Sequence, residues 1–216
     1  MSRIGEIEDY LIDELEFSED QISNAKIFPS FLALIISMYA HRDQKRINGE
    51  PYVTHPISCS ERYQKLIRLL PEKIDPKCKD LLEEHSIPYD GVQEVCLLHD
   101  VLEDTDFTMD ELRELFIEHG FEDIFINYIE EPLSLLTHDS SVPYEDYIDI
   151  VMTNPTASLV KLIDLTDNSN MLTLDKLTDH EFNRIQKYLN YAYKINNKYH
   201  FIENIKAYVD DLKNLE

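Results

Sequence analysis

The chain has 216 residues, which is enough for one domain with a substantial hydrophobic core. It contains 20 lysines and arginines against 43 aspartates and glutamates, so its formal net charge is −23. This excess of acid excludes the clustered basic surface on which nucleic-acid binders and proteins of anionic membranes depend. Neither a nucleic acid nor a membrane is therefore an expected partner.

Targeting and membrane signals are missing from the sequence. The N-terminus is acidic and lacks a basic start followed by an apolar run. The clearest apolar run, around 31–36, is far shorter than a membrane span. The three cysteines, Cys59, Cys78 and Cys96, lack CxxC spacing, which argues against a disulfide scaffold and against a thiolate zinc site. These features predict an intracellular, cytoplasmic protein.

Helical periodicity begins at the N-terminus. Apolar residues spaced near 3.6 predict an amphipathic helix over 3–16. A second helix follows Pro29 with the same spacing, and another runs through 92–98. Between them, the segment 71–90 contains three prolines and many charges, and we expect it to be an irregular excursion within one domain.

Capping signals mark the helices of the second half. Thr108 and Glu111 form a Thr-x-x-Glu capping box, and Gly120 is expected to end that helix. Thr178 and Glu181 repeat the box ahead of a long helix. The apolar stripe predicted for this helix consists of Ile185, Leu189, Ala192 and Ile195.

The whole pattern predicts an all-α fold. No long stretch alternates with period two, and the four glycines form neither GxGxxG nor GxxxxGK[ST], which excludes the commonest nucleotide-binding loops. We expect a single domain over 1–216 with roughly ten to twelve helices. Its core is expected to span about 29–198.

The strongest local signal is a His-Asp pair inside an apolar helix. At about 100° per residue, His99, Asp100, Glu103 and Asp104 fall on one side of this helix. Three acids on one face repel each other, and a bound divalent cation reverses that penalty. The alternative is an ordinary solvated acidic face, although the flanking apolar residues favour burial.

Two further segments supply similar chemistry. His55 precedes Pro56, where a helix is expected to begin, and it is either a packed structural histidine or a ligand. Asp164 stands among apolar neighbours, and a carboxylate in such surroundings is seldom buried without a partner. That partner is either a lysine or a metal ion.

Taken together, these segments supply two imidazoles and two carboxylates. The four candidate ligands are His55, His99, Asp100 and Asp164. A mixed set of this kind suits manganese, iron or zinc better than calcium. Glu103 and Asp104, one turn later, are candidates to orient a water molecule or to shuttle a proton.

The ordered motifs resemble those of the HD superfamily of metal-dependent phosphohydrolases, and more narrowly the hydrolase domain of RelA/SpoT-type alarmone enzymes and the stand-alone small alarmone hydrolases. The resemblance runs from about Phe31 to about Ile195. It implies an HD-domain helical bundle whose four ligands hold one Mn²⁺, with Glu103 and Asp104 assisting water attack on a 3′-diphosphate. The positions implied to contact the nucleotide are Arg46, Tyr52, Lys161, Asn168, Arg184 and Tyr188.

The implied reaction converts guanosine 3′,5′-bis(diphosphate) and water into GDP and pyrophosphate. A small anionic nucleotide is compatible with the negative net charge, because a metal ion and a few cationic side chains can make the electrostatic potential positive at the site. Ile47 stands where the family usually has a lysine. Two alternatives therefore stay open: hydrolysis of another nucleotide, such as the 2′-phosphate of NADPH, and a non-catalytic nucleotide sensor. The oligomeric state is not encoded in any motif.

Overall fold

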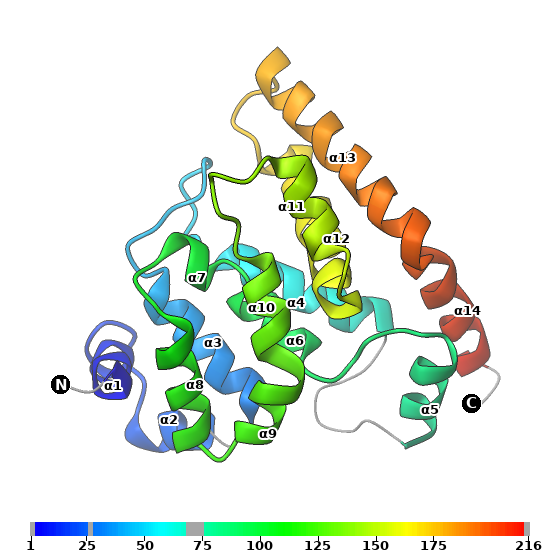
Figure 1. The fold of residues 1–216 in the computed structure, drawn as a ribbon. Helices are drawn as coiled ribbons and strands as arrows, with labels where there is room; N and C mark the ends of the chain where they lie inside the picture. The colour runs from blue at the N-terminus through cyan, green and yellow to red at the C-terminus, as the bar shows by residue number, and fades with distance from the viewer. Residues whose placement is uncertain (1–2, 26–27, 68–75, 214–216) are drawn as a thin grey trace.

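The computed structural model describes residues 3–25, 28–67 and 76–213, and their secondary structure is helical (Figure 1). The elements are α1 (Arg3–Asp13), α2 (Glu19–Ala25), α3 (Pro29–Ala40), α4 (Thr54–Ile67), α5 (Pro76–Glu84), α6 (Val92–Leu98), α7 (Val101–Asp104), α8 (Met109–Glu118), α9 (Glu122–Ile124), the π-helix η1 (Phe125–Ile129), α10 (Glu130–Leu136), α11 (Tyr144–Val151), α12 (Pro155–Asn168), the 3₁₀ turn η2 (Met171–Thr173), α13 (Asp179–Tyr199) and α14 (Phe201–Lys213).

This architecture confirms the predicted all-α class. Within the described ranges the only β-type pairing is an isolated bridge between Lys45 and Pro51. The segments α9, η1 and α10 form one continuous run, and α6 and α7 are separated by two residues. When each of these runs is counted once, the described residues contain twelve α-helices, within the expected range. None of the described helices is both long and apolar enough to cross a membrane.

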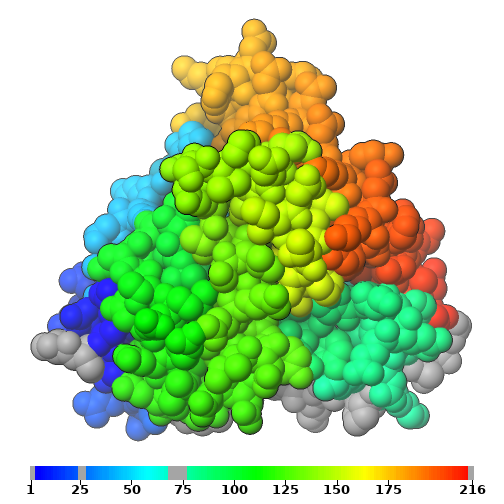
Figure 2. All heavy atoms as spheres, viewed as in Figure 1, coloured from blue at the N-terminus to red at the C-terminus, as the bar shows by residue number. Residues whose placement is uncertain are grey.

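Helix α6 is the centre of the bundle. It packs against α3, α4 and α12, and six of its seven residues are buried. The longest helix, α13, packs along α12, and its N-terminal part forms the upper tip of the molecule (Figures 1 and 2). The segments from α8 to α12 cover the front of the space-filling view (Figure 2). The core therefore lies around α6, between the helices that carry the predicted functional residues.

The predicted caps are present. Thr108 accepts a hydrogen bond from the Glu111 amide while the Glu111 side chain accepts from the Thr108 amide, which completes the capping box of α8. Thr178 caps α13 by accepting from the Glu181 amide. Gly120 follows the end of α8 with a φ of +78°, a left-handed conformation that glycine adopts without strain.

Two boundaries differ from the expectation. The N-terminal helix ends at Asp13 rather than at residue 16, and Glu16 has a φ of +59°, which a helix does not continue through. Part of the segment expected to be irregular forms α5, which packs against α14. Residues 71–75 of that segment lie outside the described ranges.

Glu94 is a buried carboxylate in the middle of α6, and burial raises its pKa from an ordinary 4.5 to about 7. An acid whose pKa is raised in the folded state lowers the free energy of unfolding as it ionises. For Glu94 this loss of stability develops between about pH 4.5 and pH 7 and stays constant above pH 7. At about 1.4 kcal/mol per pKa unit it amounts to roughly 3 kcal/mol.

We therefore expect Glu94→Gln to gain stability relative to the parent protein as the pH rises. Denaturant unfolding at several pH values should show the difference in free energy of unfolding growing by about 3 kcal/mol between pH 4.5 and pH 8. Glu114→Gln, an exposed change on α8, is the control and should show a constant difference. A pH-independent difference for Glu94→Gln would show that Glu94 has an ordinary pKa in the folded protein.

Candidate metal centre

Three parts of the chain bring the four predicted ligands together. The first turn of α4 carries His55, the break between α6 and α7 carries His99 and Asp100, and the middle of α12 carries Asp164. The Nε2 atom of His55 lies 3.3 Å from Nε2 of His99 and 3.1 Å from Oδ1 of Asp164. Oδ2 of Asp100 lies 3.2 Å from Nε2 of His99 and 3.6 Å from Nε2 of His55. The four side chains therefore converge on one point.

Hydrogen bonds to the far side of each ring fix the direction of both imidazoles. His99 Nδ1 lies 2.9 Å from the carbonyl oxygen of Cys96, which can only accept a hydrogen bond. His55 Nδ1 lies 2.8 Å from a carboxylate oxygen of Asp167. Both Nδ1 atoms are thus donors, which directs both Nε2 atoms toward the centre of the cluster, where a metal ion would take the place of a second proton.

This arrangement fits a cation. Metal–ligand bonds of about 2.1 Å separate neighbouring ligand atoms by roughly 3.0–3.4 Å in octahedral or tetrahedral geometry. The measured separations between the candidate atoms, from 3.1 to 3.8 Å, lie close to that range. The carboxylates of Asp100 and Asp164 also repel each other, and a positive charge at the centre of the cluster removes that repulsion.

Asp164 pairs with a lysine, one of the two partners that its sequence context left open, and its other oxygen faces the candidate ligands. Its Oδ1 faces the two imidazoles and accepts from Asn168 Nδ2 at 2.5 Å, whereas its Oδ2 lies 2.9 Å from Nζ of Lys161. Burial opposes ionisation of Asp164, but Lys161 and the imidazoles outweigh it and hold its pKa well below the ordinary value. Asp164 therefore offers an anionic oxygen to the cluster at neutral pH.

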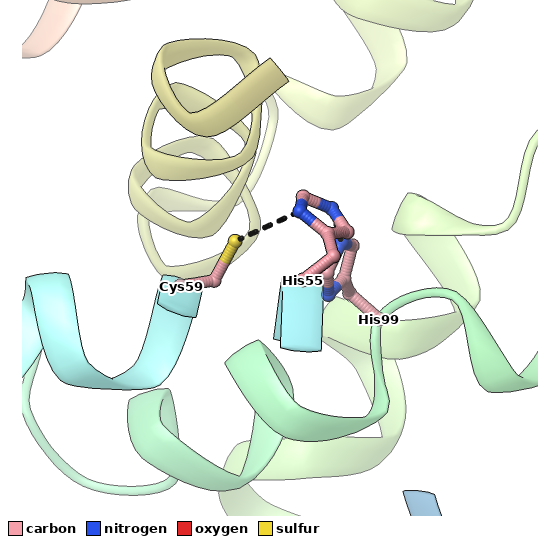
Figure 3. A group of neighbouring side chains, drawn as sticks. All are labelled: His55, Cys59 and His99. Atoms are coloured by element: carbon pink, nitrogen blue, oxygen red, sulfur yellow. Dashed lines mark hydrogen bonds between the residues drawn. The ribbon is translucent and has the colours of Figure 1, made fainter. Parts of the chain in front are cut away.

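Cys59 lies one turn after His55 on α4, and its sulfur points toward the His55 ring (Figure 3). His55, Cys59 and His99 form a compact buried group of potential ligand atoms within the described residues. The sulfur, however, is 3.9 Å from Nδ1 of His55, which is the nitrogen that donates to Asp167. Burial also raises the pKa of the Cys59 thiol to about 12, so it is a neutral thiol in the metal-free protein.

Asp167 is the main residue of the cluster that the sequence interpretation did not single out. Besides His55, it accepts hydrogen bonds from Ser58 at 2.7 Å, Arg62 at 3.0 Å and Arg46 at 3.1 Å. It lies one turn after Asp164 on α12 and therefore shares its face. A carboxylate that receives the second N–H of a ligating histidine fixes the ring orientation and raises its basicity.

Removing that carboxylate should weaken metal binding. Losing such a partner lowers metal affinity by about 10–100-fold, and we expect a loss of this size for Mn²⁺ in Asp167→Asn. Calorimetric titration of the metal-free protein measures it. Ser58→Ala removes one bond to Asp167 without touching His55 and should change the affinity by less than about threefold. Equal affinity in Asp167→Asn and the parent protein would mean that the Asp167–His55 bond does not support a metal ligand.

The predicted acid–base residues lie beside the four ligands. The Tyr52 hydroxyl is 2.8 Å from Oδ2 of Asp100 and 3.2 Å from Oδ2 of Asp104. Glu103 is exposed and accepts a hydrogen bond from the His138 amide. Burial raises the pKa of both Glu103 and Asp104, and the negative charge of Asp100 adds to it. Carboxyl groups with raised pKa values beside a ligand cluster are candidates for proton transfer.

The predicted nucleotide contacts are distributed over two regions. Tyr52, Lys161 and Asn168 each contact one of the four candidate ligands, and Arg46 reaches the cluster through Asp167. On α13, by contrast, Arg184 pairs with Glu181 and lies 5.8 Å from the ring of Tyr188. Within the described residues, neither Arg184 nor Tyr188 has a hydrogen bond or ion pair to the four candidate ligands.

Aromatic rings connect these two regions. Tyr144 packs on Tyr147 and on Tyr191 of α13, with ring centroids 5.5 and 5.1 Å apart. Lys161 lies 5.3 Å from the Tyr147 ring centroid, and Lys187 lies 4.2 Å from that of Tyr144. A cluster of rings and ammonium groups therefore lies next to Asp164, with Tyr147 buried at its base. Its residue types suit stacking with a base and pairing with phosphate.

Comparison with known proteins points in the same direction as the geometry. No family model matches the chain. It is 28% identical over 171 residues to the bifunctional (p)ppGpp synthase/hydrolase SpoT of Escherichia coli K12, covering 78% of this chain and 20% of that protein. It is 27% identical over 184 residues to guanosine-3′,5′-bis(diphosphate) 3′-pyrophosphohydrolase of Haemophilus influenzae, covering 82% and 23%. This chain thus spans about a fifth of the length of these bacterial relatives.

A shorter relative matches over most of its length. Mouse guanosine-3′,5′-bis(diphosphate) 3′-pyrophosphohydrolase MESH1 is 28% identical over 164 residues, which cover 73% of this chain and 76% of the mouse protein. Among solved structures, a metazoan ortholog of SpoT that hydrolyzes ppGpp matches with a TM-score of 0.54 at 23% identity, over 87% of this chain and 94% of that one. At this identity the structural likeness shows a shared fold. By sequence this chain is a homologue of the (p)ppGpp 3′-pyrophosphohydrolases, and it shares the fold of that metazoan SpoT ortholog.

Proposed function

We propose that the protein is a metal-dependent hydrolase that converts guanosine 3′,5′-bis(diphosphate) and water into GDP and pyrophosphate. The observation that carries the proposal is the convergence of His55, His99, Asp100 and Asp164, with candidate ligand atoms 3.1 to 3.8 Å apart. The names of the relatives supply the substrate class. A cytoplasmic location follows from the proposal, since nucleotides of this class are intracellular.

The cation proposed for this centre is a divalent metal, most simply Mn²⁺. Two imidazole nitrogens with two carboxylate oxygens match its ligand preferences better than those of Ca²⁺. When bound, such a cation lowers the pKa of a water molecule and stabilises negative charge on a phosphate. The chain's own contribution is to hold the two rings in the ligating tautomer, through Asp167 and the Cys96 carbonyl.

Glu103 and Asp104 are the proposed proton-transfer residues. Each side chain is exposed, so it keeps access to a water molecule, and its surroundings raise its pKa, which favours exchange of a proton. Tyr52 lies between Asp100 and Asp104 and holds the two carboxylates in a fixed relation. In this scheme one of the pair accepts the proton of the water that attacks the phosphorus bonded to the ribose 3′-oxygen. That P–O bond breaks, pyrophosphate carries the water oxygen, and the 3′-oxygen leaves as a hydroxyl of GDP with a proton from solvent or from the same pair.

The proposed nucleotide contacts combine rings and cations. Arg184 and Tyr188 of α13 lie on the helix that packs along α12 and are proposed to bind the nucleoside end. Lys161 is paired with Asp164, and Arg46 with Asp167, so both already neutralise acid next to the centre. They limit local repulsion of a polyanionic substrate in a chain whose net charge is −23. We propose that residues 1–216 act as one domain in this task.

A nucleotide panel tests the substrate. The purified protein, supplied with Mn²⁺, is incubated separately with guanosine 3′,5′-bis(diphosphate) and NADPH, and both pyrophosphate and phosphate are measured. The proposal predicts pyrophosphate from the first substrate and at least tenfold slower phosphate release from the second. Ile47, which is 64% exposed and supplies no charge where the family resemblance implies a lysine, is the observation that favours the second substrate. Faster turnover of NADPH, or binding without turnover of either nucleotide, would overturn the proposal.

A further inference from the structure

An apolar cavity lies on the face of α12 that points away from the candidate metal centre. It has a volume of about 450 Å³ and is formed between α4, α12 and α14. Its walls are apolar, and its lining residues are Leu66, Leu159, Leu162, Ile163, Ile202 and Ile205, together with Arg62, Lys65 and Thr166. Cavities of this size accept small organic molecules. Leu66 and Ile202 are 41% and 61% exposed, so the apolar wall is open to solvent.

The charge of this cavity is opposite to that of the molecule. Its lining contains two cations, Arg62 and Lys65, and no carboxylate, in a chain whose net charge is −23. Lys65 pairs with Glu61, but this contact joins two exposed side chains and is easily exchanged. An apolar wall with a basic end is complementary to one class of small molecule, a hydrocarbon chain that ends in a single negative charge.

The basic end is also connected to the metal centre. Arg62 Nε donates to Oδ1 of Asp167 at 3.0 Å, and Oδ2 of the same carboxylate accepts from His55 at 2.8 Å. Arg62 therefore lines the cavity and also donates to Asp167, the carboxylate that supports the candidate ligand His55. An anion in the cavity competes with Asp167 for the guanidinium, which leaves more of the Asp167 charge to polarise His55.

We propose that this cavity binds an amphipathic carboxylate of the long-chain fatty-acid class, with its head group on Arg62 and Lys65 and its chain along the apolar wall. Occupancy is coupled through Arg62 and Asp167 to the metal centre and tightens metal binding there. The binding step is independent of the proposed hydrolase function, whereas the coupling rests on the proposed metal site.

Calorimetric titration of the full chain tests the binding step with dodecanoate below its micelle concentration and with dodecanol as the uncharged probe. Saturable binding of one dodecanoate is expected, with dodecanol at least about tenfold weaker because it lacks the charge. Ile202→Glu places a negative charge on the exposed wall and should weaken dodecanoate by at least about tenfold. Ile150→Glu, an equally drastic change at a 44% exposed position on α11, should leave the affinity unchanged.

Absence of saturable binding, equal affinity for dodecanol, or equal loss in the two glutamate variants would overturn the proposal. The coupling is read from the Mn²⁺ affinity with and without saturating dodecanoate. A several-fold tighter Kd for Mn²⁺ is expected in the parent protein and no change in Arg62→Gln, which removes the connection. Dodecanoate binding with an unchanged Mn²⁺ affinity would refute the coupling. None of these readouts uses hydrolysis, so they remain informative even if the proposed substrate is wrong.

Discussion

Replacing Asp100 by asparagine should remove the bound metal and the hydrolytic activity together. Asp100 supplies one of the four converging oxygen and nitrogen atoms, and an amide neither carries its charge nor neutralises a cation. Loss of the cation removes both water activation and phosphate charge stabilisation. We expect the metal content to fall from one Mn²⁺ per chain to almost none and the rate to fall by at least about 10³-fold.

The design of this variant limits its effect on folding. The Asp100 side chain is 18% exposed, and asparagine keeps its shape and can still accept a hydrogen bond from Tyr52. Asp110→Asn, at an 85% exposed position on α8, is the matched control and should keep full metal content and activity. Elemental analysis and initial rates on both variants decide the matter. An Asp100→Asn protein that still contains one metal ion and works within a few-fold of the parent rate would exclude Asp100 as a ligand.

The second large effect is expected at Glu103, and it separates catalysis from metal binding. Glu103→Gln removes a proton acceptor but none of the four candidate ligands. General acid–base catalysis contributes about 10²–10⁴-fold, and kcat should fall by an amount in that range. The metal content and the KM should change little, because neither depends on proton transfer.

Glu114→Gln is the control for this experiment, since it makes the same chemical change on the exposed side of α8. Metal content is measured on the protein samples used for the rates. If Glu103→Gln lost its metal as well, Glu103 would have a structural role in the centre. If its kcat were unchanged, Asp104 alone would have to transfer the proton, and Asp104→Asn would then show the full loss.

Local sequence information was sufficient for the helices and for the identity of the ligand candidates. The capping residues Thr108 and Thr178 were recognisable because their partners lie three residues away. His55 and Asp164, in contrast, are 109 residues apart, and no periodicity relates them. The expectation that they belong to one site came from their matching ligand chemistry and then from the resemblance of the ordered motifs to a known family.

What the sequence did not reveal depends on tertiary packing. Asp167 was visible as a carboxylate, but its role depends on which atom of His55 faces it. Lys161 pairs with Asp164 in the structure, and a lysine was one of the two partners expected for that carboxylate; its contact with a nucleotide stays a prediction. Leu189 was assigned to the apolar stripe of α13 and is 54% exposed, because α12 packs along only one side of this helix. Periodicity identifies a face, but the neighbours decide how much of it is buried.

A metal titration with product analysis tests the central claim most directly. The metal-free protein receives Mn²⁺ in steps from zero to three equivalents per chain, and pyrophosphate release from guanosine 3′,5′-bis(diphosphate) is measured at each step. The account predicts no release without metal, a linear rise that ends at one equivalent, and equal amounts of GDP and pyrophosphate. Release that is already complete in the metal-free protein, or none at any metal concentration, would contradict it.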